Sequence, residues 1–145
     1  MTDLDTIPPH DPGAERVVLC GLLIAWEVVS GEVRRVGLRG DDLYLDLHRR
    51  VWGAAAGLAY AGRPVTPWSV WRWLEPEWGE WPRVGVQNAA MSCAAWLVGL
   101  TDEDPTGYWA MEKAVRVRDL AERRRVIHRA RAAIRDALGG RPVDD

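Results

Sequence analysis

This 145-residue chain contains a single lysine, Lys113, and no phenylalanine. A phosphate-binding P-loop needs a Gly-Lys pair, and here Glu112 precedes the lysine, so no P-loop can form. The chain also lacks a Gly-x-Gly-x-x-Gly sequence, the glycine fingerprint of dinucleotide-binding folds. We therefore expect no cofactor, no nucleotide-dependent activity and no enzyme.

Cysteine and long apolar runs are equally scarce. Cys20 and Cys93 lie far apart without a CxxC pair, so we expect two reduced core residues and no metal site. No apolar run approaches the roughly 18–20 residues of a membrane span, and the first five residues show no targeting pattern. These absences favour a cytoplasmic protein that does not contact a membrane.

The charged residues are distributed unevenly along the chain. Residues 113–141 carry ten basic and three acidic side chains, a net charge of +7, whereas the remainder carries nine basic and eighteen acidic ones. An acidic body with a basic C-terminal arm indicates an anionic partner. The overall balance, 48% hydrophobic and 28% charged, is typical of one soluble globular domain.

Apolar spacing and capping signals predict an all-α fold, a compact bundle of about five or six helices with a long amphipathic C-terminal helix. No β-alternating run stands out. Asp11-Pro12 and Thr66-Pro67 pair a capping side chain with proline at the first helical position, and Asp46 is a third candidate cap. The expected helices are a buried one over 14–26, an irregular one within 30–42, and regular ones over 47–61, 66–75, 87–100 and 105–138. A Gly/Pro-interrupted loop is expected over 78–86.

These elements predict a simple organisation. Residues 1–12 form a flexible, proline-rich leader, 13–104 the helical bundle, 105–138 a long basic arm that starts at the Thr101–Pro105 capping signal, and 139–145 a tail.

Three blocks of the sequence resemble the N-terminal domain of DnaB-type replicative DNA helicases, in the order and near the spacing of that family. They are Pro9-His-Asp-Pro-Gly-Ala-Glu15 through Leu23, Asp42-Leu-Tyr44 through Thr66, and Val117 through Ile127. The sequence departs from the family pattern at Cys20, where glycine is usual, and at Leu43, where phenylalanine is usual. The ATPase motor and the acidic second helix of the family's helical hairpin are not found in these residues.

The resemblance implies a helical bundle that has no catalytic residues and forms part of a hexamer's collar of paired subunits, which helps recruit primase and loading factors. We therefore expect a non-enzymatic interaction and oligomerisation module of DNA replication. Its expected partners are a second copy of itself, as a homodimer or larger assembly, and a replication protein such as helicase, primase or loader.

Two groups of side chains are candidates for an interface. Partly exposed tryptophans are typical interface anchors, although they can equally fold back onto their own domain; the candidates are Trp73, Trp78 and Trp81. The long helix carries an apolar stripe at seven- or four-residue spacing that either pairs with another helix or docks on its own body: Leu120, Ile127, Ile134 and Leu138.

The alternative interpretation is a nucleic-acid-binding protein. Arg118, Arg125 and Arg129 lie opposite the apolar stripe and are candidate phosphate contacts, although the acidic body makes such binding weak and non-specific. For His48 we expect a structural hydrogen bond, and for the acidic pairs at 41–42 and 102–104 we expect capping or turn roles in preference to cation binding.

Overall fold

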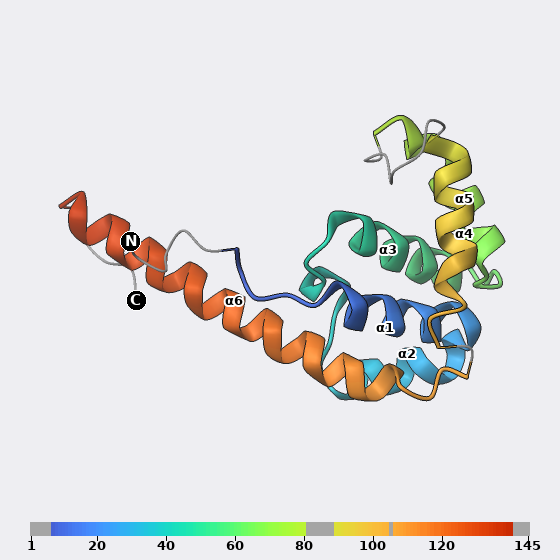
Figure 1. Ribbon diagram of the computed structural model, residues 1–145, viewed down its shortest axis with the longest axis horizontal. Helices are drawn as coiled ribbons and strands as arrows, with labels where there is room; N and C mark the ends of the chain where they lie inside the picture. Colours follow the sequence, from blue (N-terminus) through green and yellow to red (C-terminus); the bar gives the residue numbers. More distant parts are fainter. Residues whose placement is uncertain (1–6, 81–88, 105, 141–145) are drawn as a thin grey trace.

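In the computed structural model every regular element among the described residues is helical, as predicted (Figure 1). The structure describes residues 7–80, 89–104 and 106–140, with the backbone alone for 78–80 and 89–94. The elements are α1 (Pro12–Ile24), α2 (Trp26–Arg35), the 3₁₀ helix η2 (Gly40–Asp42), α3 (Asp46–Tyr60), α4 (Pro67–Leu74), the 3₁₀ helix η3 (Glu75–Glu80), α5 (Ala89–Leu100) and α6 (Ala110–Leu138). No described helix is long and apolar enough to cross a membrane.

The first helix is the centre of the bundle, packed against α2, α3, α5 and α6. Its start is the predicted one, because the Asp11 carboxylate accepts a hydrogen bond from the Ala14 N–H at 3.0 Å and Pro12 follows the cap. Val18, Leu19 and Leu22 are almost completely buried. Because the sequence of α1 is apolar on nearly every face, neighbouring helices cover most of its faces.

The second helix corrects the sequence analysis, which expected an irregular helix and loop over 30–42. The chain leaves helical geometry only at Ala25 (φ −145°, ψ 61°) and at once begins α2. Val29 and Val33 lie one turn apart and are buried, so tertiary burial of this face stabilises a regular ten-residue helix.

The starts of α3 and α4 show one wrong and one correct cap. Asp46 is not a cap: Leu45 precedes the helix, and the Asp46 carboxylate instead accepts a hydrogen bond from Arg50 at 2.8 Å. The Thr66 hydroxyl does cap α4, accepting from the Ser69 N–H at 3.0 Å. Between the two helices Gly62 adopts φ +71°, the left-handed geometry that ends α3 as predicted.

The predicted start of the long helix at 101–105 is wrong. Asp104 instead accepts hydrogen bonds from Thr106 and from the Trp109 N–H, both at 2.8 Å. Gly107 turns the chain with φ +69°, which a continuous helix cannot include, so α6 begins at Ala110. It ends at the predicted Gly139-Gly140 pair.

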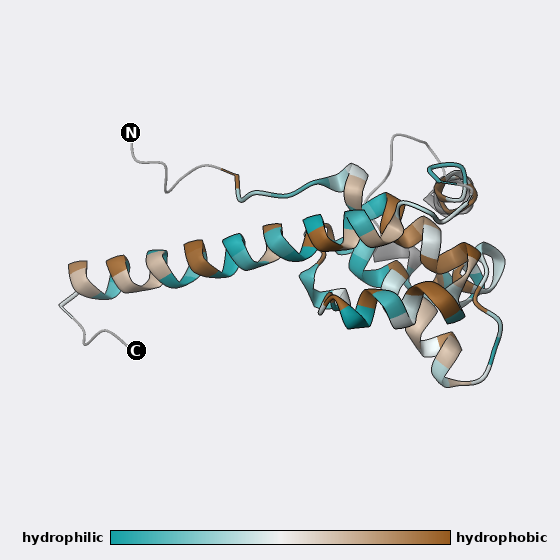
Figure 2. Ribbon diagram, turned by 90° about the horizontal axis from the view of Figure 1, so that it is seen from below, coloured by the Kyte–Doolittle hydropathy of each residue, from teal (hydrophilic) through white to brown (hydrophobic). Residues whose placement is uncertain are grey.

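The 29-residue helix α6 has two unlike halves. Its first part lies along α1 and buries Ala110, Ala114, Val117, Leu120 and Ala121. Its second part projects beyond the other helices, as Figures 1 and 2 show. We call residues 126–138 the distal arm.

Candidate interaction surface

The distal arm exposes large apolar side chains. Val126, Ile134 and Leu138 have exposed fractions of 54%, 41% and 84%. Ile127 is half-buried and lines a hollow of about 510 Å³ with Pro9 and Val126. Figure 2 shows hydrophobic and hydrophilic bands alternating along this part of the helix. No other labelled helix lies alongside this part of α6 in Figures 1 and 2, and the exposed fractions of Val126, Ile134 and Leu138 make them candidates for contact with a partner.

The predicted stripe of four residues is thus divided by the fold. Leu120 is 7% exposed and belongs to the buried side of α6, so it offers little surface to a partner. Ile127 stands at the boundary, and Ile134 and Leu138 lie beyond it.

The tryptophans are divided as well. Trp73 is 43% exposed, yet its ring packs so closely on Gly57 that a Cβ there would lie 2.7 Å from the Trp73 Cζ2 atom. It is therefore partly folded back on α3. Trp68 is more exposed, at 66%, and stacks on Trp71 with ring centroids 4.7 Å apart. The side chain of Trp78 and the whole of Trp81 lie outside the described residues.

Two of the three arginines proposed to contact phosphate have partners within the fold. Arg118 donates to the Val36 carbonyl oxygen at 2.8 Å, and Arg125 forms ion pairs with Asp42 and Glu122. Arg129 is exposed and makes no hydrogen bond to the described residues. The three candidate phosphate contacts therefore do not form a row of unpaired arginines, which favours the interaction module over the nucleic-acid alternative.

Arg124, whose role the sequence analysis did not predict, holds α6 at the point where the helix leaves the bundle. Arg124 donates to the Pro9 carbonyl oxygen at 2.9 Å and to the Asp42 carbonyl oxygen, and its guanidinium lies 5.4 Å from the Tyr44 ring centroid. Burial lowers the pKa of Arg124. About two turns earlier on α6, Arg116 pairs with Asp11. Residues 9–11 and η2 thus hold α6 through polar contacts.

The sequence also did not indicate the buried Glu15–His48 pair. Glu15 and His48 are 1% and 2% exposed, and His48 Nδ1 lies 2.8 Å from Glu15 Oε1. The Tyr44 N–H donates to the same carboxylate at 2.7 Å. Burial raises the pKa of Glu15, but the hydrogen bonds from His48 and Tyr44 outweigh it and hold the pKa below its ordinary value. The expected structural role of His48 is confirmed. The available signal was an acid near the start of a helix that is otherwise largely apolar.

One residue of each acidic cluster has the expected capping or turn role. Asp42 accepts from the Arg39 N–H at 2.8 Å and caps η2, and Asp104 organises the turn before α6. Among the described residues no three His, Cys, Asp or Glu side chains are grouped to hold a metal ion. Cys20 is buried as a free thiol, and burial raises its pKa.

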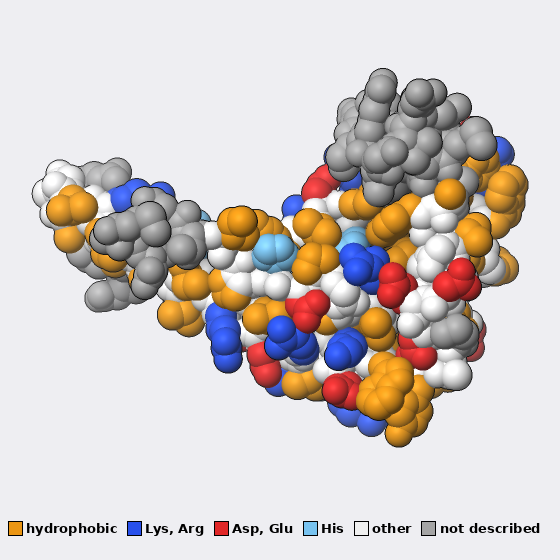
Figure 3. All heavy atoms as spheres, viewed as in Figure 1, with side chains coloured by type: hydrophobic (Ala, Val, Ile, Leu, Met, Phe, Trp, Pro, Cys, Tyr) orange, Lys and Arg blue, Asp and Glu red, His pale blue; other side chains and the backbone are white. Residues whose placement is uncertain are grey.

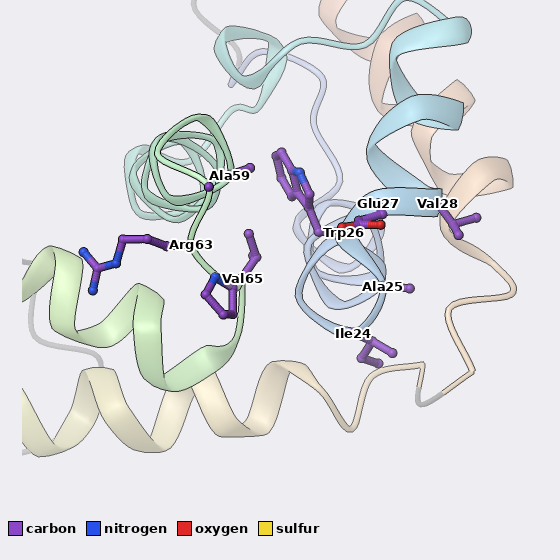
Figure 4. Close-up of a pocket in the computed structure, with 10 residues that line it drawn as sticks. Ile24, Ala25, Trp26, Glu27, Val28, Ala59, Arg63 and Val65 are labelled. Atoms are coloured by element: carbon purple, nitrogen blue, oxygen red, sulfur yellow. The ribbon is translucent and has the colours of Figure 1, made fainter.

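A groove of about 740 Å³ with a mixed polar and apolar lining separates the α1–α2 junction from the α3–α4 loop (Figure 4). Trp26 points into it between the helices, while Arg63 points away. Its walls include Ile24, Pro64 and Val65, and Glu27 is the one acidic side chain in its described lining. The described lining pairs no nucleophile with a base, which is the arrangement that nucleophilic catalysis needs.

Comparison with known proteins agrees with this architecture. The family model for the DnaB-like helicase N-terminal domain matches residues 7–115, three quarters of the chain. The chain belongs to this family. The DnaB N-terminal domain match covers α1 through the first turns of α6 and ends before the distal arm.

A solved relative extends the similarity through the arm. The N-terminal domain of DnaB helicase from Mycobacterium tuberculosis matches with a TM-score of 0.79 and 27% sequence identity, over 96% of this chain and 90% of that one. No curated protein matches significantly. Both comparisons thus match this chain to the N-terminal helical domain of DnaB helicases.

Proposed function

We propose that this chain is a non-enzymatic interaction and oligomerisation module of DNA replication. It self-associates through the distal arm and binds a replication protein such as helicase, primase or loader. The observation that carries this proposal is the exposed apolar stripe on a helix that projects from its own bundle. Family membership supports the same class of function.

The stripe provides a physical reason for self-association. An isolated helix as short as the distal arm is marginal in water, and exposed Ile134 and Leu138 add apolar surface that water disfavours. Fully burying one such side chain contributes roughly 1.5–3 kcal/mol, so two stripes packed together offset much of the cost of association.

The distal arm also carries exposed arginines, whose mutual repulsion works against pairing of two arms and should make pairing depend on salt. Arg129 and Arg135 are exposed on the distal arm, and Figure 3 shows basic side chains beside hydrophobic ones along α6. Like charges on two paired arms repel, and salt screens this repulsion. Self-association should therefore strengthen as salt is raised, whereas an ion-paired interface would weaken.

The chemistry of the described residues supports a module without catalysis. His48 is buried and bonded to Glu15, so it cannot reach a substrate. Lys113 follows Glu112 and not the glycine that a P-loop requires. Purified protein should not turn over ATP; turnover that a point mutation within the chain abolishes would contradict the proposal.

Analytical ultracentrifugation at tens of micromolar tests the self-association. Wild type should sediment as a dimer or larger species, and an Ile134→Asp/Leu138→Asp variant as a monomer with unchanged helical circular dichroism, because charges in the seam cannot be buried without partners. Val28→Asp is the matched control, since Val28 is 64% exposed on the bundle and should leave assembly unchanged. A monomeric wild type, or equal dissociation by the control, contradicts the proposal.

Sedimentation with purified replicative helicase, primase and loader from the same host tests the second part. We expect the chain to co-sediment with at least one of them. Failure to bind any of the three, with a wild-type chain that still self-associates, would limit the function to assembly.

A further inference from the structure

A pocket of about 360 Å³ lies where η2 meets the middle of α6. Arg124, Arg125, His128 and Arg129 reach it from one face of α6, because residues three to five apart lie on neighbouring turns of a helix. Asp41 and Asp42 reach it from η2. Its volume lies within the range of about 300–1,000 Å³ that is common for small-molecule sites.

The charges of this pocket are only partly compensated. Arg125 pairs with Asp42, so these two side chains neutralise one another. Arg124 is held by carbonyl oxygens and the Tyr44 ring, and no carboxylate is among its described hydrogen-bond partners. Arg129 makes no hydrogen bond to the described residues. Arg124 and Arg129 therefore form no direct ion pair with a described carboxylate, while the charges of Glu15 and Asp42 act on Arg124 and the exposed Asp41 also lines the pocket.

We propose that this pocket binds a phosphoryl dianion, supplied as inorganic phosphate or as a phosphate monoester. A carboxylate carries one negative charge, and a single guanidinium neutralises it, as Arg125 does for Asp42. A dianion engages Arg124 and Arg129 together through paired N–H donors, which is the geometry in which arginine binds phosphate best. This site goes beyond the proposed function and does not depend on self-association.

A nucleic-acid backbone fits the pocket less well. Each phosphodiester carries one charge, and non-specific binding to such a chain depends on several basic side chains in a row. Arg118 and Arg125, which would extend the row, are bonded within the fold. The terminal phosphate of a small molecule or of a phosphorylated side chain is the better match.

The position of the site links binding to the arm. Arg124 belongs to the contacts that hold α6 to residues 9–11 and η2, and Arg129 lies in the distal arm. A dianion between them connects the fixed part of the helix with the projecting part.

Isothermal titration calorimetry with inorganic phosphate tests the proposal, using the whole chain at constant ionic strength with chloride as the replaced anion. We expect saturable binding of one phosphate. Arg129→Gln should weaken it about tenfold, equal to about 1.4 kcal/mol, because one charged hydrogen-bonding group is lost. Arg135→Gln removes the same charge from the same helix outside the pocket and should have no effect.

A second variant should improve binding and so cannot be explained by misfolding. Asp41→Asn removes the negative charge that opposes the anion, and we expect tighter phosphate binding. Absence of saturation in the wild type, or equal weakening by Arg129→Gln and Arg135→Gln, would overturn the proposal. Either result would indicate that α6 attracts anions only non-specifically.

Competitors identify the chemistry and its source. Phosphoserine or adenosine 5′-monophosphate should displace phosphate, and the stronger of the two indicates a phosphoprotein or a nucleotide as the source. Acetate, and an oligonucleotide without a terminal phosphate, should not displace it at equal concentration. Equal displacement by either of these would overturn the assignment to a phosphoryl dianion.

Discussion

Replacement of Glu15 by alanine should destabilise this protein more than any change on its surface. The Glu15 carboxylate accepts hydrogen bonds from His48 Nδ1 at 2.8 Å, the Tyr44 N–H at 2.7 Å and the Leu45 N–H at 3.4 Å. Alanine removes the acceptor of all three and leaves the imidazole of His48 buried without its partner. A buried donor left unsatisfied costs about 1–3 kcal/mol, so the first two bonds alone predict a loss of about 2–6 kcal/mol.

Urea denaturation followed by circular dichroism measures this loss. A domain of this size is stable by roughly 5–15 kcal/mol, and a slope of about 1–3 kcal/mol per molar urea makes the expected shift in midpoint on the order of 1 M or more. Glu27→Ala is the control, because Glu27 is exposed and should change stability by about 0.5 kcal/mol or less. A Glu15→Ala variant within 1 kcal/mol of the wild type would refute the reasoning that the pair is buried and mutually dependent.

Further predictions concern pH, packing and thiol chemistry. The pKa of Glu15 is held below its ordinary value of 4.5 in the folded chain, so the unfolded chain takes up the proton first as the pH falls. The free energy of unfolding should therefore decrease as the pH drops below about 4.5, and it should decrease less in the Glu15→Gln variant. Urea midpoints at pH 7, 5 and 3 measure both changes. Gly21→Ala should destabilise the fold by about 1–3 kcal/mol, because the new Cβ would lie 2.8 Å from the Ala110 Cβ. Gly31 lies inside α2 with open space around it, so Gly31→Ala should stabilise the fold by about 0.5–1 kcal/mol in the same assay. In a Cys93→Ser variant, Cys20 should resist alkylation at pH 8 until urea unfolds the protein, because burial blocks access and raises the thiol pKa; rapid alkylation of the native state would contradict its burial.

The local sequence alone determined those features that depend on a few neighbouring residues. The caps at Asp11 and Thr66 act on backbone N–H groups three residues on, so their residue types predicted two helix starts directly. Gly62 and Gly139-Gly140 predicted two helix ends for the same reason. The family resemblance also depends on short blocks read in order, and the family match confirmed it.

Tertiary structure decided which of several equivalent patterns is buried. The periodicity of α6 continues from Leu120 to Leu138 without a change that the sequence shows, and only the end of its contact with α1 makes Leu120 core and Leu138 exposed. The same holds for the charges. Arg125 and Arg129 lie one turn apart on the same side of α6, but the Asp42 carboxylate of η2 pairs with Arg125 and not with Arg129. Glu15 and His48 meet across 33 positions because α1 and α3 pack side by side. A helical period specifies which side chains share a face, whereas the element that covers that face depends on the packing of the whole chain.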